Sequence, residues 1–131
     1  MLEVIKLFKQ IQDTSSLNDK KAIISANKDN ELFKKCLVFL LDGNVTTGIS
    51  TAKIKKDIWL DSYVLKLDTF EDVMNYIKEN NTGTDLNILT VQMFIRMQPE
   101  EYREFYEEMV TKKFRLGIDI KGVNKVIPNL I

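Results

Sequence analysis

One basic segment near the C-terminal end carries the residue types that recognise phosphate. Arg115 precedes the turn Leu116-Gly117, and Lys121 and Lys125 follow in the next helical pattern. A glycine turn ahead of a helix start exposes backbone N–H groups, and the helix dipole favours an anion there. Because Lys121 and Lys125 are four residues apart, they share one side of that helix. The segment suits a phosphate of a nucleic-acid backbone, although by spacing alone a solvated helix–turn–helix connection is the more ordinary interpretation.

A second cluster near the N-terminus repeats this chemistry. Ser15 and Ser16 precede a helical pattern that contains Lys20 and Lys21. Hydroxyl oxygens at a helix start accept hydrogen bonds from its free N–H groups, and the two lysines add positive charge beside it. This cluster therefore predicts a second phosphate contact, again with a solvated helix start as the ordinary alternative.

The residue types that catalysis needs are absent or isolated. The chain has no histidine and only one cysteine, which removes the common general base, the usual nucleophile pairs and the usual zinc ligands. Nucleotidyl transfer by ligases uses Lys-x-Asp-Gly, but no lysine stands two residues before Asp42-Gly43, so that pair is interpreted as a helix end. The glycines are scattered and form no phosphate loop. Glu100, Glu104 and Glu108 share a helix face that we interpret as solvated.

Hydrophobic residues recur at helical spacing along most of the chain, and no alternating strand pattern is sustained. Caps and breakers divide this pattern; Asp68-Thr-Phe-Glu71 matches a capping box, and Pro99 suits a first helical turn. The expected helices are Leu2–Gln12, Leu17–Asn27, Asp29 or Asn30 to Leu41, Asp68 to the break at Asn80, Thr84 or Asp85 to Met97, Pro99 to the Leu116-Gly117 pair, and Ile120 or Lys121 to Ile127. The patterns predict an all-α fold, a single compact domain of about six or seven helices.

The Val45–Leu67 stretch is the exception, because it gives no clear period. Its threonines, serines and glycine weaken a helix, yet its apolar residues still require a core. We expect short helical turns or an extended crossing segment. The apolar residues concerned are Ile54, Ile58, Trp59, Val64 and Leu65.

Length and composition bound the class of protein. A chain of 131 residues with 44% hydrophobic and 29% charged residues is typical of one soluble globular domain. No apolar run approaches the roughly 20 residues that cross a bilayer, and no signal-peptide order is present, so we expect a cytoplasmic protein. Cys36 lies in an apolar helix pattern and is expected to be a buried thiol. The formal net charge is zero, which argues against a strongly basic nucleic-acid binder, but a neutral domain can carry a basic face.

Two motifs resemble the N-terminal domain of phage-type ATP-dependent DNA ligases. The first is Ser16 followed by Lys20-Lys-Ala-Ile-Ile24 and Asn27-Lys-Asp-Asn-Glu-Leu32. The second is Phe114-Arg-Leu-Gly-Ile118 followed by Val123-Asn-Lys-Val-Ile-Pro-Asn-Leu-Ile131. The resemblance covers nearly the whole chain, but Val45–Leu67 departs from the family pattern. It implies an all-helical, non-catalytic, monomeric domain that binds the minor groove of nicked double-stranded DNA on both sides of the nick.

The resemblance also implies partners and site residues. In this family the nucleophilic lysine, ATP and Mg²⁺ belong to the following catalytic domain, so this chain would need no cofactor of its own. The chain would be a fragment or partial product from a bacterial or phage-infected cell. Its partners would be the missing catalytic and OB-fold domains, in DNA replication, repair and recombination. The residues expected to approach DNA are Ser15, Ser16, Lys20, Lys21, Arg115, Gly117, Lys121, Asn124 and Lys125.

Two other classes of protein fit the same helices. An all-helical protein–protein interaction module would explain the zero net charge and the acidic Glu100–Glu108 face, and it would need a large exposed apolar patch. A small phage structural or regulatory protein would be favoured by dimerisation through Trp59 and the surrounding Val45–Leu67 stretch. A basic surface that joins the two helix-start turns would favour DNA instead.

Overall fold

The computed structural model describes residues 1–131 and confirms the all-α class. It has eight helices and no strand, and the helix beyond the expected six or seven is a single turn inside the stretch without a clear period. The helices are α1 (Leu2–Asp13), α2 (Leu17–Ala26), α3 (Glu31–Leu41), α4 (Thr51–Ile54), α5 (Phe70–Glu79), α6 (Asp85–Arg96), α7 (Glu100–Val110) and α8 (Ile120–Val126). None is long and apolar enough to span a membrane.

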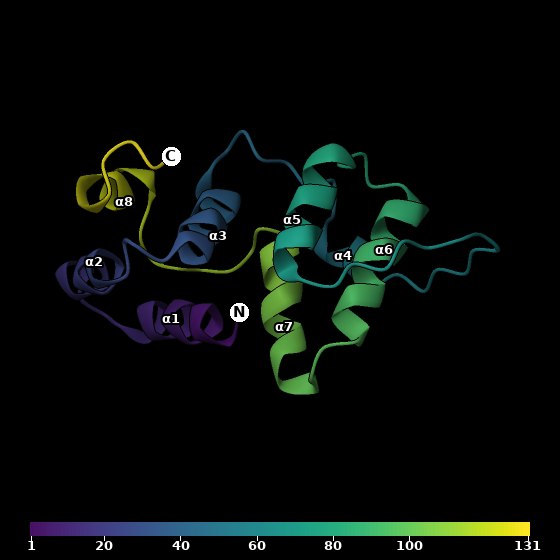
Figure 1. The fold of residues 1–131 in the computed structure, drawn as a ribbon, viewed down its shortest axis with the longest axis horizontal. Helices are drawn as coiled ribbons and strands as arrows, with labels where there is room; N and C mark the ends of the chain where they lie inside the picture. The colour runs from purple at the N-terminus through teal and green to yellow at the C-terminus, as the bar shows by residue number, and fades with distance from the viewer. The chain divides into compact units, whose positions relative to one another are not determined.

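Within the chain these helices group into two compact units. Unit 1 comprises Met1–Asn44 and Arg115–Ile131, and unit 2 comprises Val45–Phe114. Figure 1 shows that α8, at the yellow end of the chain, lies with the purple N-terminal helices. Both ends of the chain therefore build unit 1.

Unit 1 is made of α1, α2, α3 and α8, and α2 packs against both α1 and α8. The helical period of α1 turns Ile5, Phe8 and Ile11 inward, where all three are buried. The ring of Phe8 meets that of Phe33 on α3 edge-on, with the centroids 5.7 Å apart. Cys36 is buried in the same unit, as its apolar surroundings predicted. Apolar burial of this kind is the main stabilising contribution to such a unit.

Short polar side chains fix where the helices of unit 1 begin. Ser16 begins α2, Asn30 begins α3 and Asp119 begins α8, each by accepting a hydrogen bond from the backbone N–H three residues later. Ser16 and Asn30 were among the caps that the sequence predicted, because such side chains satisfy N–H groups that the first turn leaves unpaired.

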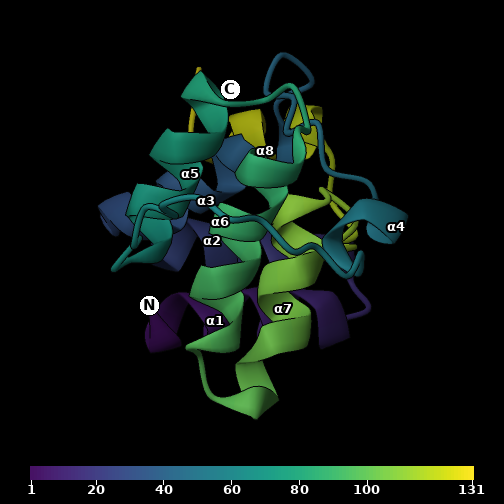
Figure 2. The same cartoon turned by 90° about the vertical axis from the view of Figure 1, so that its right-hand side faces the viewer.

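Unit 2 contains α4 to α7. Helices α6 and α7 lie side by side, and α5 packs against α6 (Figure 2). Phe70 of α5 and Phe94 of α6 both meet Tyr106 of α7, at ring-centroid distances of 5.2 and 5.3 Å. Aromatic pairs at such distances contribute about 0.5–1.5 kcal/mol beyond their buried area. This aromatic cluster joins the three long helices of the unit.

The capping box of α5 is displaced by one residue from the predicted one. Thr69, rather than Asp68, begins the helix and accepts from the N–H of Asp72 at 3.1 Å. The carboxylate of Asp72 accepts from the N–H of Thr69 at 3.2 Å, which closes the reciprocal pair. The predicted box was wrong because it relied on Glu71 at the third helical position, whereas the shorter aspartate makes the same return bond here.

Helix α7 ends at Val110, well before the Leu116-Gly117 pair where the sequence predicted its end. Lys112 takes a left-handed φ of 58°, and the N–H groups of Lys112 and Lys113 bond back to carbonyls of the last helical turn at 3.0 and 2.8 Å. These two bonds form a Schellman-type helix end. Because glycine usually occupies the left-handed position and lysine does here, the residue type did not reveal the end of the helix.

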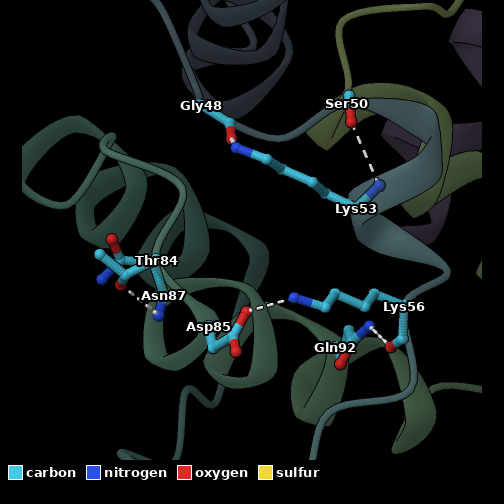
Figure 3. Close-up of polar contacts among 8 residues, drawn as sticks. All are labelled: Gly48, Ser50, Lys53, Lys56, Thr84, Asp85, Asn87 and Gln92. Carbon is cyan, nitrogen blue, oxygen red and sulfur yellow. Dashed lines mark hydrogen bonds and ion pairs between the residues drawn. The ribbon is translucent and has the colours of Figure 1, made fainter.

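The Val45–Leu67 stretch combines one helical turn with extended chain, as predicted. After α4 the chain runs out from the helices and returns to α5 (Figure 1). The side-chain amide of Gln92 on α6 donates to the carbonyl oxygens of Ile54 at 3.0 Å and Lys56 at 2.8 Å. Figure 3 shows the bond to Lys56. These bonds hold the C-terminal end of α4 against α6.

The apolar residues of this stretch divide between core and surface. Ile54 and Ile58 are buried, as expected. Trp59 is 86% exposed, Tyr63 is 82% exposed and Leu65 is also exposed. The expectation that Trp59 and Leu65 enter a core was therefore wrong. They lie on the extended loop beyond the helices, where the chain has no packed layer to receive them.

Candidate nucleic-acid interface

All nine residues that the sequence predicted to approach DNA lie in unit 1. This unit contains ten lysines and arginines against seven aspartates and glutamates, a formal charge of +3. Unit 2 contains nine against twelve, a formal charge of −3. The zero net charge of the chain is therefore the sum of a positive and a negative unit. An anionic polymer would be attracted to unit 1.

The Arg115–Gly117 turn is fixed by a side chain from α1 and by its own glycine. The amide of Gln12 donates to the carbonyl oxygen of Arg115 at 3.0 Å. Gly117 has a φ of +78°, a backbone conformation that side-chain-bearing residues rarely adopt. The backbone N–H groups of residues 115–118 have no hydrogen-bond partner within the protein. A phosphate oxygen is an acceptor that could satisfy them.

The start of α8 differs from the phosphate-binding helix start that the sequence suggested. Asp119 caps the helix, and its carboxylate accepts from the N–H of Gly122 at 2.9 Å. The positive end of the helix dipole is therefore already matched by a carboxylate of the chain itself. Any phosphate contact has to be made by the turn before Asp119 and by lysines of α8, since the helix start itself is occupied.

The side chains of four of the predicted cations make no ion pair or hydrogen bond in the structure. Arg115, Lys121 and Lys125 are exposed, and Lys21 is half-buried. Lys121 and Lys125 lie one turn apart on α8, which packs against the α2 helix that carries Lys21. Because no carboxylate neutralises these side chains, their charge is available to an external anion.

A shallow hollow lies between the Arg115–Gly117 turn and the first residue of α2. It is lined by Arg115, Gly117, Ile118 and Asp119 from the second cluster, and by Leu17 from the start of α2. Leu17 directly follows Ser16, but no residue of the first predicted cluster itself lines the hollow. Ser15 is exposed, whereas the hydroxyl of Ser16 is used as the α2 cap, accepting from the backbone N–H of Asp19 at 3.3 Å.

The polar side-chain atoms of Lys20 and Asn124 are already hydrogen-bonded to backbone groups of the protein. Lys20 is only 6% exposed, and its ammonium donates to the carbonyl oxygens of Ile11 at 2.5 Å and Leu116 at 3.0 Å. The amide of Asn124 exchanges two hydrogen bonds with the backbone of Ile131, at 3.1 and 3.2 Å. We therefore leave both residues out of the set of direct phosphate contacts, in contrast to the expectation from the sequence.

Sequence reasoning missed Gln12 altogether. A glutamine near the exposed end of a helix gives no signal that its side chain reaches a turn 103 residues further along the chain. Only the packing of both chain ends into one unit brings α1 to that turn.

The structure also reveals a repeat between the two units. Gly48-Ile49-Ser50 in unit 2 matches Gly117-Ile118-Asp119 in unit 1, each with a positive-φ glycine, a buried isoleucine and a helix cap. In unit 2 the ammonium of Lys53 donates to the carbonyl of Gly48 at 3.4 Å (Figure 3). The turn chemistry of the candidate site is thus used twice in the chain.

No protein-family model, curated protein or solved structure matches the chain.

Proposed function

We propose that this chain is a DNA-binding domain of the ATP-dependent DNA ligase type, which binds nicked duplex DNA without sequence preference. The observation that supports this most is that unit 1 carries four cationic side chains without an ion pair, Arg115, Lys21, Lys121 and Lys125, together with a turn whose backbone N–H groups have no partner. Groups of this kind bind phosphate oxygens, and such contacts fix position without reading sequence. The nick, the minor groove and the ligase context come from the two motifs that resemble the family. In this proposal the domain acts as a monomer and leaves all chemistry to the catalytic domains.

The proposal is tested by a salt-titrated binding assay of the full 131-residue chain. Nicked and intact duplexes of two unrelated sequences are compared by fluorescence anisotropy. We expect equal affinity for both sequences and a linear fall of log affinity with log salt. If all four cations contact phosphate, the slope has a magnitude of about 3 to 4. A strong preference for one sequence, or no binding at low salt, would contradict the proposal.

Single substitutions assign the contacts. Arg115→Ala and Lys121→Ala should each weaken binding on every duplex, and each should lower the magnitude of the salt slope by about 0.9. Lys78→Ala is the matched control, since Lys78 is also exposed and without an ion pair but lies in the negatively charged unit 2. It should change neither the affinity nor the slope.

One observation favours a second function, that of a protein–protein interaction module. The loop between α4 and α5 exposes Trp59 and Tyr63 almost completely, on the unit with a formal charge of −3. Exposed aromatic residues are common at protein interfaces. Under this alternative the chain binds no DNA even at low salt, and Trp59→Ser abolishes self-association or partner binding measured by sedimentation. Under the DNA proposal the same substitution leaves DNA affinity unchanged.

A further inference from the structure

Lys20 occupies an unusual position for a lysine. It lies on α2, is 6% exposed, and has no carboxylate partner; its ammonium donates only to the carbonyl oxygens of Ile11 and Leu116. A buried cation is costly unless hydrogen bonds replace its water shell. A methionine would fill a similar volume without that cost. What the ammonium adds at this position is a fixed orientation for the two carbonyl groups.

One of those carbonyls belongs to the turn of the candidate interface. The oxygen of Leu116 is bound by Lys20, and the oxygen of the preceding residue, Arg115, is bound by Gln12. Two consecutive peptide groups thus have their acceptor sides tied to α1 and α2. Their donor sides remain without a partner, because the N–H groups of residues 115–118 bond to nothing in the protein. Fixing the carbonyl of a planar peptide also fixes the N–H of the same peptide, which points the opposite way.

The close approach of Lys20 leaves no room for a side chain at position 117. A Cβ built on Gly117 would lie 2.8 Å from the ammonium nitrogen of Lys20 and 3.1 Å from its last carbon. The head of Lys20 therefore fills the space beside this glycine, as well as binding the carbonyl before it. Lys20 thus binds the carbonyl of Leu116 and packs beside Gly117, two of the three residues of the turn.

We propose that Lys20 is a positioning residue of the DNA interface: it contacts no DNA, and it orients the Arg115–Gly117 turn so that the free N–H groups meet phosphate. The inference rests on the proposed function and deepens it. It separates two adjacent lysines, since Lys20 acts through the turn, whereas Lys21 is half-buried with an unpaired ammonium that can approach an anion directly.

The test is a double-mutant cycle on DNA binding, combined with NMR of the DNA-free protein. Lys20→Met should shift the amide resonances of residues 115–118 in the absence of DNA and weaken binding to a nicked duplex by about tenfold, the effect of losing one charge-assisted hydrogen bond. Because Lys20 acts through the turn, the loss of DNA affinity caused by Lys20→Met should not add to the loss caused by Arg115→Ala. The double variant should have about the affinity of whichever single variant binds less tightly. Lys21→Met is the matched control: its loss should add to that of Arg115→Ala and leave the turn resonances in place.

Each outcome bears on a different statement. Fully additive losses for Lys20→Met and Arg115→Ala, or unmoved resonances of residues 115–118, would overturn the positioning role while leaving the proposed function intact. Absence of DNA binding by the unsubstituted chain would overturn the proposed function and the positioning role with it. If Lys20→Met fails to fold by circular dichroism, Gln12→Leu replaces it, because this variant releases the neighbouring carbonyl from an exposed position and should give the same non-additive loss.

Discussion

Replacing Gly117 by alanine tests the geometry of the turn through stability alone. An L-residue in the left-handed region costs about 1–2 kcal/mol, and Gly117 has a φ of +78°. The new Cβ would lie 2.8 Å from the ammonium of Lys20, so that group has to shift, and we expect the shift to disrupt its hydrogen bond to the carbonyl of Leu116. A buried hydrogen bond to a charged group contributes about 1.5–3 kcal/mol, while the lower entropy of the unfolded alanine chain offsets about 0.4–1 kcal/mol. We therefore expect Gly117→Ala to lower the free energy of unfolding by about 2–4 kcal/mol.

The assay is urea unfolding followed by circular dichroism, with Gly43→Ala as the control. Gly43 belongs to the same unit, has no positive φ, and a Cβ there would meet nothing within 4 Å. Its substitution should stay within about 0.5 kcal/mol of the parent chain. In a Lys20→Met background, Gly117→Ala should lose only its backbone component, so the two changes should couple by more than about 1 kcal/mol. The reasoning fails if Gly117→Ala is as mild as Gly43→Ala, or if the two changes simply add.

Three further substitutions test other parts of the structure. Phe8→Ala removes a fully buried ring that packs against Phe33, and it should cost about 3–5 kcal/mol in the same urea assay. Trp59→Ser, on an exposed loop, should change stability by less than about 0.5 kcal/mol, so a large loss would show that this side chain is packed. The hydrogen bond and the charge of Glu107 raise the pKa of the exposed Lys55 ammonium, and its small stabilising contribution is therefore present at neutral pH and lost as pH rises above its ordinary value of about 10.4. A stability difference between the parent and Lys55→Met should accordingly be at most about 1 kcal/mol at pH 8 and should shrink as the pH rises through the raised pKa of Lys55; a difference that grows with pH would contradict this sign.

Local signals allowed most of the helices to be predicted. Ser16, Asn30 and Thr84 cap helices where the sequence placed a cap, because the hydrogen bond from a capping oxygen involves residues only three apart. The prediction of the C-terminal end of α7 was wrong because it also depended on a local signal. A helix end is usually predicted from a glycine or asparagine, which tolerate the left-handed backbone conformation. Lys112 adopts this conformation, but its residue type gives no sign of it.

The candidate site could be predicted only in part, since its key contacts are not local. The basic residues around Arg115 and on α8 are visible in the sequence as a cluster. The roles of Gln12 and Lys20 depend on contacts with residues about a hundred positions away, 103 and 96 respectively. A lysine in an amphipathic pattern is expected to be solvated, and only the tertiary structure shows that the Lys20 ammonium is enclosed by two carbonyls.

The zero net charge of the chain conceals an uneven distribution of charge between its two units. A net charge of zero argued against a nucleic-acid binder, because a polyanion is attracted by an excess of positive charge. Attraction acts over about 8–10 Å at ordinary salt, a distance shorter than a folded unit. What a phosphate meets is therefore the charge of the surface near it, and unit 1 carries +3 while unit 2 carries −3. If Arg115, Lys21, Lys121 and Lys125 determine affinity, removing acids from unit 2 should strengthen DNA binding far less than removing any one of these cations weakens it. Variants in which exposed acids of unit 2 are replaced by their amides, with binding measured at two salt concentrations, would decide whether the local or the total charge governs binding.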